Sequence, residues 1–118
     1  MQVRPTHPSS QLVALDLAVK AIEVLRNPVA KIRRHDRDLG EQLRRALSSV
    51  ALNLAEGSGN YDGNKLTRYS TAQGSNYEAR NALRVAIAWG YVSTEELADG
   101  EALLDRVSAM LYRLRGTR

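Results

Sequence analysis

The sequence predicts an all-α protein, an up-down-up-down antiparallel four-helix bundle. Apolar residues recur at steps of three and four in four separate segments, and glycine-rich or polar turns separate these segments. Because consecutive helices joined by short turns pack antiparallel, the four segments are expected to form a bundle. A chain of 118 residues suits one such domain, which we place at 11–118 after a flexible N-terminal tail, 1–10.

The first helix is predicted from about Gln11 to Arg34, with Ser9 or Ser10 as its N-cap. Its seam keeps a three-and-four step along Leu15, Ala18, Ile22, Leu25, Val29 and Ile32. Pro28 removes one backbone hydrogen bond but leaves this periodicity intact, so we expect a kink there and not an end.

The second helix is expected to begin at a capping box of Asp38 and Glu41 and to end at Gly57. Its apolar face is formed by Leu39, Leu43, Ala46, Val50 and Leu54. The same step places Asn53 in the seam and Glu56 at its edge. Because a buried amide or carboxylate is costly without a partner, both side chains require polar groups on another helix.

The third helix is predicted from near Asn64 to Gly90, and the fourth begins at a capping box of Ser93 and Glu96. A stripe of small residues on the third helix lets a neighbour approach closely: Ala72, Ser75, Ala79, Ala82 and Ala86. The fourth helix carries the apolar residues Leu97, Leu104, Val107, Leu111 and Leu114.

The polar residues between the second and third helices are interpreted as a structural polar seam that sets the helix register. This seam comprises Asn53, Glu56, Ser75 and Glu78, with Arg80 or Tyr69 compensating the carboxylates. The chain lacks the Glu-x-x-His repeats of a di-iron bundle and any Ser-His-Asp constellation. We therefore expect no catalytic residue, no metal site and no cofactor, and the protein is not expected to be an enzyme.

Arginine dominates the positive charge of the chain, which has a net charge of +4. Two groups are candidates for nucleic-acid binding: Arg33, Arg34, Arg37, Arg44 and Arg45 in the first, and Arg113 and Arg115 in the second. The first group has two interpretations, phosphate contact with RNA or DNA and compensation of the acidic start of the fourth helix. For the second, favourable interaction with the helix dipole is a sufficient structural reason.

Trp89 and Tyr91 flank Gly90 at the end of the third helix. Exposed rings at this position would stack on bases, whereas rings packed on the core would close the turn. Both interpretations remain open from the sequence.

More apolar residues are present than one bundle seam needs. The surplus lies on the first and fourth helices, at Val13, Leu17, Val24, Leu103 and Met110. We expect these residues to form a homo-oligomer interface, although scattered exposed apolar residues are also normal in monomers.

The remaining composition favours a cytoplasmic protein. There is no run of 18 apolar residues that would span a membrane, no pattern of a secretion signal, and no cysteine. No membrane partner is therefore expected.

One series of motifs resembles a known family. Asp16-Leu17 is followed by Gln42-Leu43-Arg44-Arg45-Ala46, and Asn53-Leu54-Ala55-Glu56-Gly57 is followed by Gly74-Ser75 and Gly90-Tyr91-Val92. This order resembles the four-helix bundle proteins found in intervening sequences of 23S ribosomal RNA genes, also called the S23 ribosomal protein family. The chain departs from the family pattern at Ala18-Val19 and in the basic segment 33–37.

The resemblance implies a four-helix bundle that assembles into a ring-like homo-oligomer, commonly a pentamer. A distant branch of the family comprises accessory proteins of diversity-generating retroelements, which implies RNA, DNA or a reverse transcriptase as partners. The two arginine groups would form basic rims on such a ring. Together with the resemblance, they favour a non-enzymatic, nucleic-acid-associated or adaptor scaffold. The alternative is a purely structural or protein-binding oligomer.

Overall fold

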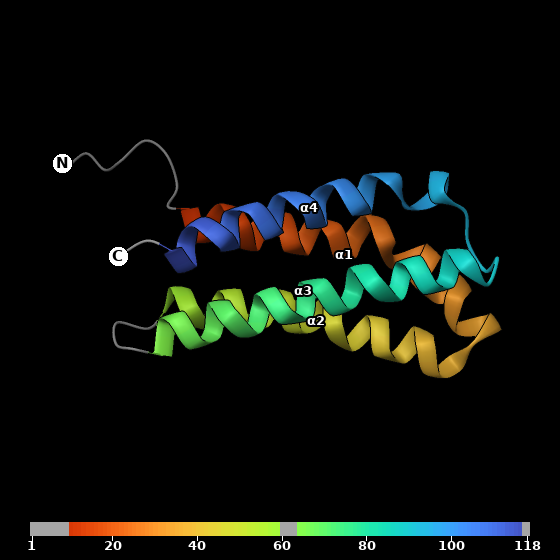
Figure 1. The fold of residues 1–118 in the computed structure, drawn as a ribbon, viewed down its shortest axis with the longest axis horizontal. Helices are drawn as coiled ribbons and strands as arrows, with labels where there is room; N and C mark the ends of the chain where they lie inside the picture. Colours follow the sequence, from red (N-terminus) through yellow and green to blue (C-terminus); the bar gives the residue numbers. More distant parts are fainter. Residues whose placement is uncertain (1–9, 60–63, 117–118) are drawn as a thin grey trace.

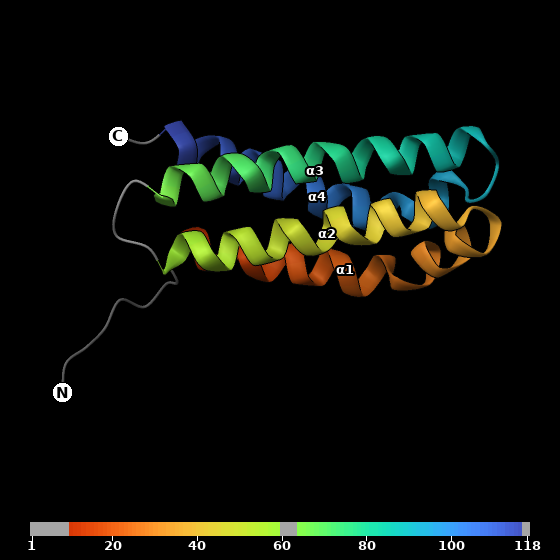
Figure 2. The ribbon, with the colours of Figure 1, turned by 90° about the horizontal axis from the view of Figure 1, so that it is seen from below.

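The computed structural model describes residues 10–59 and 64–116, and every regular element in these stretches is an α-helix, which confirms the all-α prediction. The helices are α1 (Ser10–His35), α2 (Arg37–Ser58), α3 (Asn64–Ala88) and α4 (Thr94–Gly116). Figures 1 and 2 show them side by side along the long axis. Both α1 and α3 pack against α2 and α4. We call the end where α1 meets α2 and α3 leads to α4 the turn end.

α1 is a single helix that continues through Pro28. Its buried stripe consists of Ala14, Ala18, Ala21, Leu25, Val29 and Ile32. Leu15 and Ile22 of the predicted seam are half-buried at the edges of this stripe. Ser10 is the first residue of α1, and the rest of the predicted tail, including Ser9, lies outside the described residues.

The predicted capping box of α2 is wrong. The N-cap is Asp36, whose Oδ1 accepts a hydrogen bond from the Leu39 N–H at 3.0 Å. The reason is that α1 runs to His35, so one residue alone separates the two helices and has to serve as the cap. Glu41 instead forms an ion pair with Arg33.

The predicted end of α2 at Gly57 is also displaced, because the helix continues to Ser58 and Gly59 is its C-cap. Gly57 is buried against the ring of Tyr69 on α3, where an added Cβ would lie 2.5 Å from Cε1. Gly100 has the same role between α4 and α1, since a Cβ there would lie 2.4 Å from Leu25 Cδ2. Both glycines permit a helix contact that any side chain would obstruct.

The core consists of two apolar clusters along the bundle. The larger contains Leu25, Ile32, Leu43, Leu83 and Leu104, among others, and the smaller contains Val50, Leu54, Tyr69, Val107 and Leu111. Of the predicted small-residue stripe on α3, every alanine is buried, while Ser75 is half-buried. The close packing of α3 therefore rests on these alanines.

Candidate nucleic-acid interface

Five predicted arginines and one further arginine share one side of the α1–α2 pair. A groove of about 350 Å³ between the helices is lined by Arg26, Arg33 and Arg44, with Val29 and Leu47 among its apolar residues. Arg33 also lines a hollow with Arg34 and Arg37, and Arg44 lines another with Arg45. Because the hollows share these residues, they form one surface. We call it the arginine surface: Arg26, Arg33, Arg34, Arg37, Arg44 and Arg45.

Arg26 was not among the predicted site residues. It precedes Arg33 by seven positions, which is two helical turns, so the two side chains lie on the same face of α1. The seven-residue spacing is visible in the sequence, and it could have identified Arg26 as a further residue of the first arginine group.

The arginine surface is only partly neutralised. Glu41 pairs with Arg33 at 2.8 Å and with Arg44 at 3.3 Å. Within residues 10–59 and 64–116, Arg26, Arg34, Arg37 and Arg45 form no ion pair. Between residues 26 and 45 there are seven Lys or Arg side chains and three Asp or Glu side chains. The surface therefore presents positive charge to solvent.

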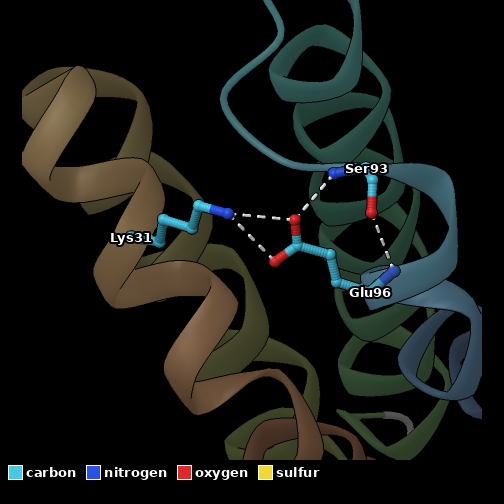
Figure 3. A network of polar contacts seen from close by, with 3 residues as sticks. All are labelled: Lys31, Ser93 and Glu96. Atoms are coloured by element: carbon cyan, nitrogen blue, oxygen red, sulfur yellow. Dashed lines mark hydrogen bonds and ion pairs between the residues drawn. The ribbon is translucent and has the colours of Figure 1, made fainter.

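The acidic start of α4 lies at the turn end, but Lys31 is the residue that meets it (Figure 3). Its Nζ lies 3.1 Å from Glu96 Oε2, which also accepts the Ser93 N–H at 2.9 Å. The Glu96 N–H in turn donates to Ser93 Oγ at 3.1 Å, so the predicted capping box is confirmed. The pKa of Glu96 lies below its ordinary value, first because of the Ser93 N–H and then because of Lys31. In the described part of the chain, Arg34 and Arg37 take no part in this compensation.

The second arginine group lies apart from the first. Arg113 and Arg115 belong to the last turn of α4, at the end opposite the turn end, and line an open hollow with Tyr112. The structure thus brings together the first group of predicted arginines and does not join the second to it.

The predicted polar seam is present in part. Asn53 Nδ2 donates to Ser49 Oγ at 3.0 Å, and that hydroxyl lies 2.7 Å from Ser75 Oγ. Arg68 extends the network, because its guanidinium donates to Asn53 Oδ1 at 3.4 Å and pairs with Glu56 at 3.1 Å. Glu56 is exposed and forms an ion pair with Arg68, whereas Arg80 or Tyr69 had been predicted to compensate it.

The remaining seam residue, Glu78, and the predicted compensating residue Arg80 have partners outside this network. Glu78 is exposed and accepts a hydrogen bond from Gln42 at 3.4 Å. Arg80 pairs with Asp105 of α4 at 3.2 Å. The α2–α3 register therefore depends on serine and asparagine, and the carboxylates lie at its exposed margins.

Among the described residues, the fully buried polar side chains are Gln73 and Asn76 of α3, and neither was predicted from the sequence. Gln73 Nε2 donates to the Ser108 carbonyl at 3.1 Å and Asn76 Nδ2 to the Leu104 carbonyl at 3.2 Å, so both join α3 to α4. Burial also raises the pKa of Tyr69 on the same face. A sequence pattern could have predicted this buried face. Residues at steps of three and four form a second stripe on α3: Tyr69, Ala72, Asn76, Ala79 and Leu83.

The residues predicted for an oligomer interface are all half-buried within the chain. Val24 and Leu103 pack against the larger core cluster, and Leu17 and Met110 against the smaller one. Val13 is half-buried on α1 as well. Part of the apolar surplus is therefore covered inside one chain. Of the large apolar residues that the structure describes, those with the greatest exposure lie elsewhere, including Leu52, Leu66, Tyr77, Trp89 and Tyr112.

The described residues place no group of three or more His, Asp or Glu side chains where they would hold a metal ion. Over the same residues, no helix combines the length and apolar character needed to cross a membrane.

Comparison with known proteins identifies the family. Residues 12–113 match the family described as 23S rRNA-intervening sequence proteins. No curated protein and no solved structure matches the chain. Because the match covers most of the chain, including all but the margins of the four helices, the chain belongs to the 23S rRNA-intervening sequence protein family.

Proposed function

We propose that the protein is a non-enzymatic, RNA-associated scaffold of the cytoplasm, in which up-down-up-down bundles assemble into a ring-like homo-oligomer. The observation that carries the proposal is the arginine surface along α1 and α2. Four of its six guanidinium groups form no ion pair within residues 10–59 and 64–116, so they are available to an anionic partner.

The surface would act on phosphates and not on base edges. Arginine presents a planar fork of donors that matches phosphate oxygens, and such contacts position a nucleic acid without reading its sequence. The name of the family refers to 23S rRNA, which favours RNA over DNA as the partner. Binding of this kind releases counterions and therefore weakens steeply as salt rises.

An oligomer would repeat the arginine surface in each subunit. Contacts that are individually weak then act together on one RNA, because binding of the first site raises the local concentration for the next. The exposed apolar residues Leu52, Leu66 and Tyr77 support a subunit contact, since large apolar side chains in water favour burial. The subunit number is proposed to be five, as in the ring-forming relatives that the sequence motifs suggested.

A specific observation also favours the alternative, a structural or protein-binding oligomer without a nucleic-acid role. Glu41 lies within the arginine surface and neutralises Arg33 and Arg44. A surface that already contains a carboxylate also suits a protein partner, for example a reverse transcriptase, which would pair with the remaining arginines.

The decisive experiment measures binding of labelled RNA and DNA across a range of salt concentrations. For the wild-type chain, affinity should fall steeply with salt. The triple variant Arg34→Ala, Arg37→Ala and Arg45→Ala removes guanidinium groups without ion pairs. Each lost phosphate contact should lower the slope of log K against log salt by about 0.7–0.9, so the variant should lose about 2 or more.

The matched control removes the same charge elsewhere, through Lys20→Ala, Arg84→Ala and Arg106→Ala, all exposed positions outside the arginine surface. Equal losses in both triple variants would show that net charge matters and the surface does not. Absence of RNA and DNA binding at low salt would reject the nucleic-acid role and leave the protein-binding alternative. Light scattering after size-exclusion chromatography gives the molar mass of the assembly in solution. The mass of a single chain would contradict the proposed oligomer.

A further inference from the structure

Three aromatic rings stack at the turn end of the bundle. The His35 ring, on the last residue of α1, lies 5.1 Å from the Tyr91 ring between centroids, with 5° between the planes. The Trp89 ring lies 6.3 Å from the same Tyr91 ring at 17°. Both separations fall within the range of stacked aromatic pairs. Residues more than 50 positions apart in the sequence therefore form one aromatic stack, with Tyr91 as the shared ring.

The backbone holds this stack in place. After α3, the Gly90 N–H donates to the Ile87 carbonyl at 2.9 Å and the Tyr91 N–H to the Ala86 carbonyl at 3.0 Å. With Gly90 at φ +81°, these two bonds form a Schellman motif, which fixes the orientation of the residues on either side of the glycine. Tyr91 packs against the larger core cluster, so the middle of the stack is anchored.

Trp89, in contrast, is left open to water. The residue is 68% exposed although it is the largest apolar side chain in the sequence. From the sequence, two roles were open for Trp89 and Tyr91, closure of the turn and presentation of a stacking surface. The structure divides the two tasks, since Tyr91 is half-buried on the core and Trp89 remains accessible.

Two arginines that form no ion pair among the described residues flank the His35 end of the stack. Arg34 precedes His35 and Arg37 follows it by two positions; both are exposed. Of the neighbouring carboxylates, Asp36 accepts the Leu39 N–H and Glu96 is held by Lys31 and Ser93. The further carboxylates here, Asp38 and Glu95, are exposed at the starts of α2 and α4.

We propose that Trp89, supported by Tyr91 and His35, is a stacking platform for an unpaired base of single-stranded RNA whose phosphates contact Arg34 and Arg37. The proposal rests on the RNA association proposed above and adds the class of RNA and a second point of contact. Aromatic platforms beside basic side chains bind single strands, because every unpaired base presents a flat face and every linkage a charge. A duplex keeps its bases stacked on each other and offers no such face.

The chain provides its own probe, since Trp89 is its sole tryptophan. In titrations of the wild-type chain with a short single-stranded RNA, stacking should quench the Trp89 fluorescence. A duplex of the same sequence, and an abasic strand with the same sugar-phosphate backbone, should cause little quenching even where they bind the arginine surface. Fluorescence anisotropy of labelled RNA then gives the affinity of variants that lack the tryptophan.

Trp89→Ala should weaken binding of the single strand about tenfold and leave the abasic strand unaffected, whereas Trp89→Phe should restore part of the loss. The matched control is Val85→Ala, which removes an apolar side chain that is 44% exposed one helical turn before Trp89 on α3 and that carries no ring. This control should bind single-stranded RNA as the wild-type does.

The outcomes separate this proposal from the function on which it rests. If the arginine triple variant loses RNA while Trp89→Ala keeps wild-type affinity, the RNA follows the arginine surface alone and the platform is wrong. If the wild-type binds no RNA, the proposed function itself fails, and the platform with it. If Trp89→Ala lowers the oligomer mass and leaves RNA affinity unchanged, a second copy covers Trp89 and the platform is again rejected.

Discussion

Ser49 Oγ of α2 lies 2.7 Å from Ser75 Oγ of α3, which makes this hydroxyl pair the centre of the polar contact between the two helices. Asn53 donates to the same Ser49 hydroxyl, and Arg68 links Asn53 to Glu56. The pair is half-buried, so each hydroxyl would lack full access to water if its partner were removed.

Loss of either hydroxyl should destabilise the fold. Ser49→Ala and Ser75→Ala should each lower the free energy of unfolding by about 1 kcal/mol, and the double variant should cost less than the sum. Urea unfolding of the four proteins gives the coupling. Ser70→Ala, at an exposed position of α3, corrects for the higher helix propensity of alanine. Strict additivity of the two serine variants would contradict the contact.

Two glycines in helices should respond oppositely to alanine. Gly57→Ala places a Cβ 2.5 Å from the Tyr69 ring and should lower the free energy of unfolding by about 1–3 kcal/mol. Gly74 has no atom within 4 Å of such a Cβ, so Gly74→Ala should stabilise the chain by about 0.5–1 kcal/mol. Thermal unfolding measures both changes. A loss of stability in Gly74→Ala that depends on protein concentration would place Gly74 in a subunit contact.

Glu96 should make stability depend on pH. Its pKa lies below the ordinary value of 4.5 because the Ser93 N–H and then Lys31 favour the carboxylate. A carboxyl group whose pKa is lower in the folded than in the unfolded state stabilises the fold at any pH above the unfolded-state pKa. This stabilisation is lost as the pH falls through the folded-state pKa. Wild-type and Glu96→Gln should therefore differ in melting temperature near neutral pH and converge in acid.

Glu95→Gln is the matched control for this change, since Glu95 is exposed in the same helical turn. It should leave the pH profile of the melting temperature close to that of the wild-type. A constant difference between wild-type and Glu96→Gln across the whole acid range would show that the carboxylate charge has no part in capping α4.

The predicted oligomer face makes a further test possible. Leu103 packs against the larger core cluster, so Leu103→Ala should lower the free energy of unfolding by about 1–2 kcal/mol at every protein concentration. Because Leu52 is 64% exposed, Leu52→Ala should have little effect on the free energy of unfolding of a single chain. Denaturant curves at two protein concentrations distinguish the roles. A substitution in a subunit contact shifts the midpoint by an amount that depends on protein concentration, whereas a substitution in the core of one chain shifts it equally at both.

The sequence alone determined the helices, and with them the all-α class and the family. Periodicity at three and four residues is a local property of the chain, and capping signals such as Ser93 with Glu96 act within one helical turn. The same information misplaced the cap of α2, because Asp38 with Glu41 fits the capping-box pattern, whereas the true cap, Asp36, is followed at the third position by Leu39. The choice depends on where α1 ends.

The tertiary structure alone decided which polar and basic groups meet. The orientation of α3 about its own axis buries Gln73 and Asn76 against α4 and leaves Glu78 exposed. This orientation depends on how alanines and glycines pack between the helices. The contact between α1 and α2 likewise joins Arg26 to Arg44 in one groove. These contacts join residues far apart in the sequence, and their energies depend on distances that no local pattern specifies.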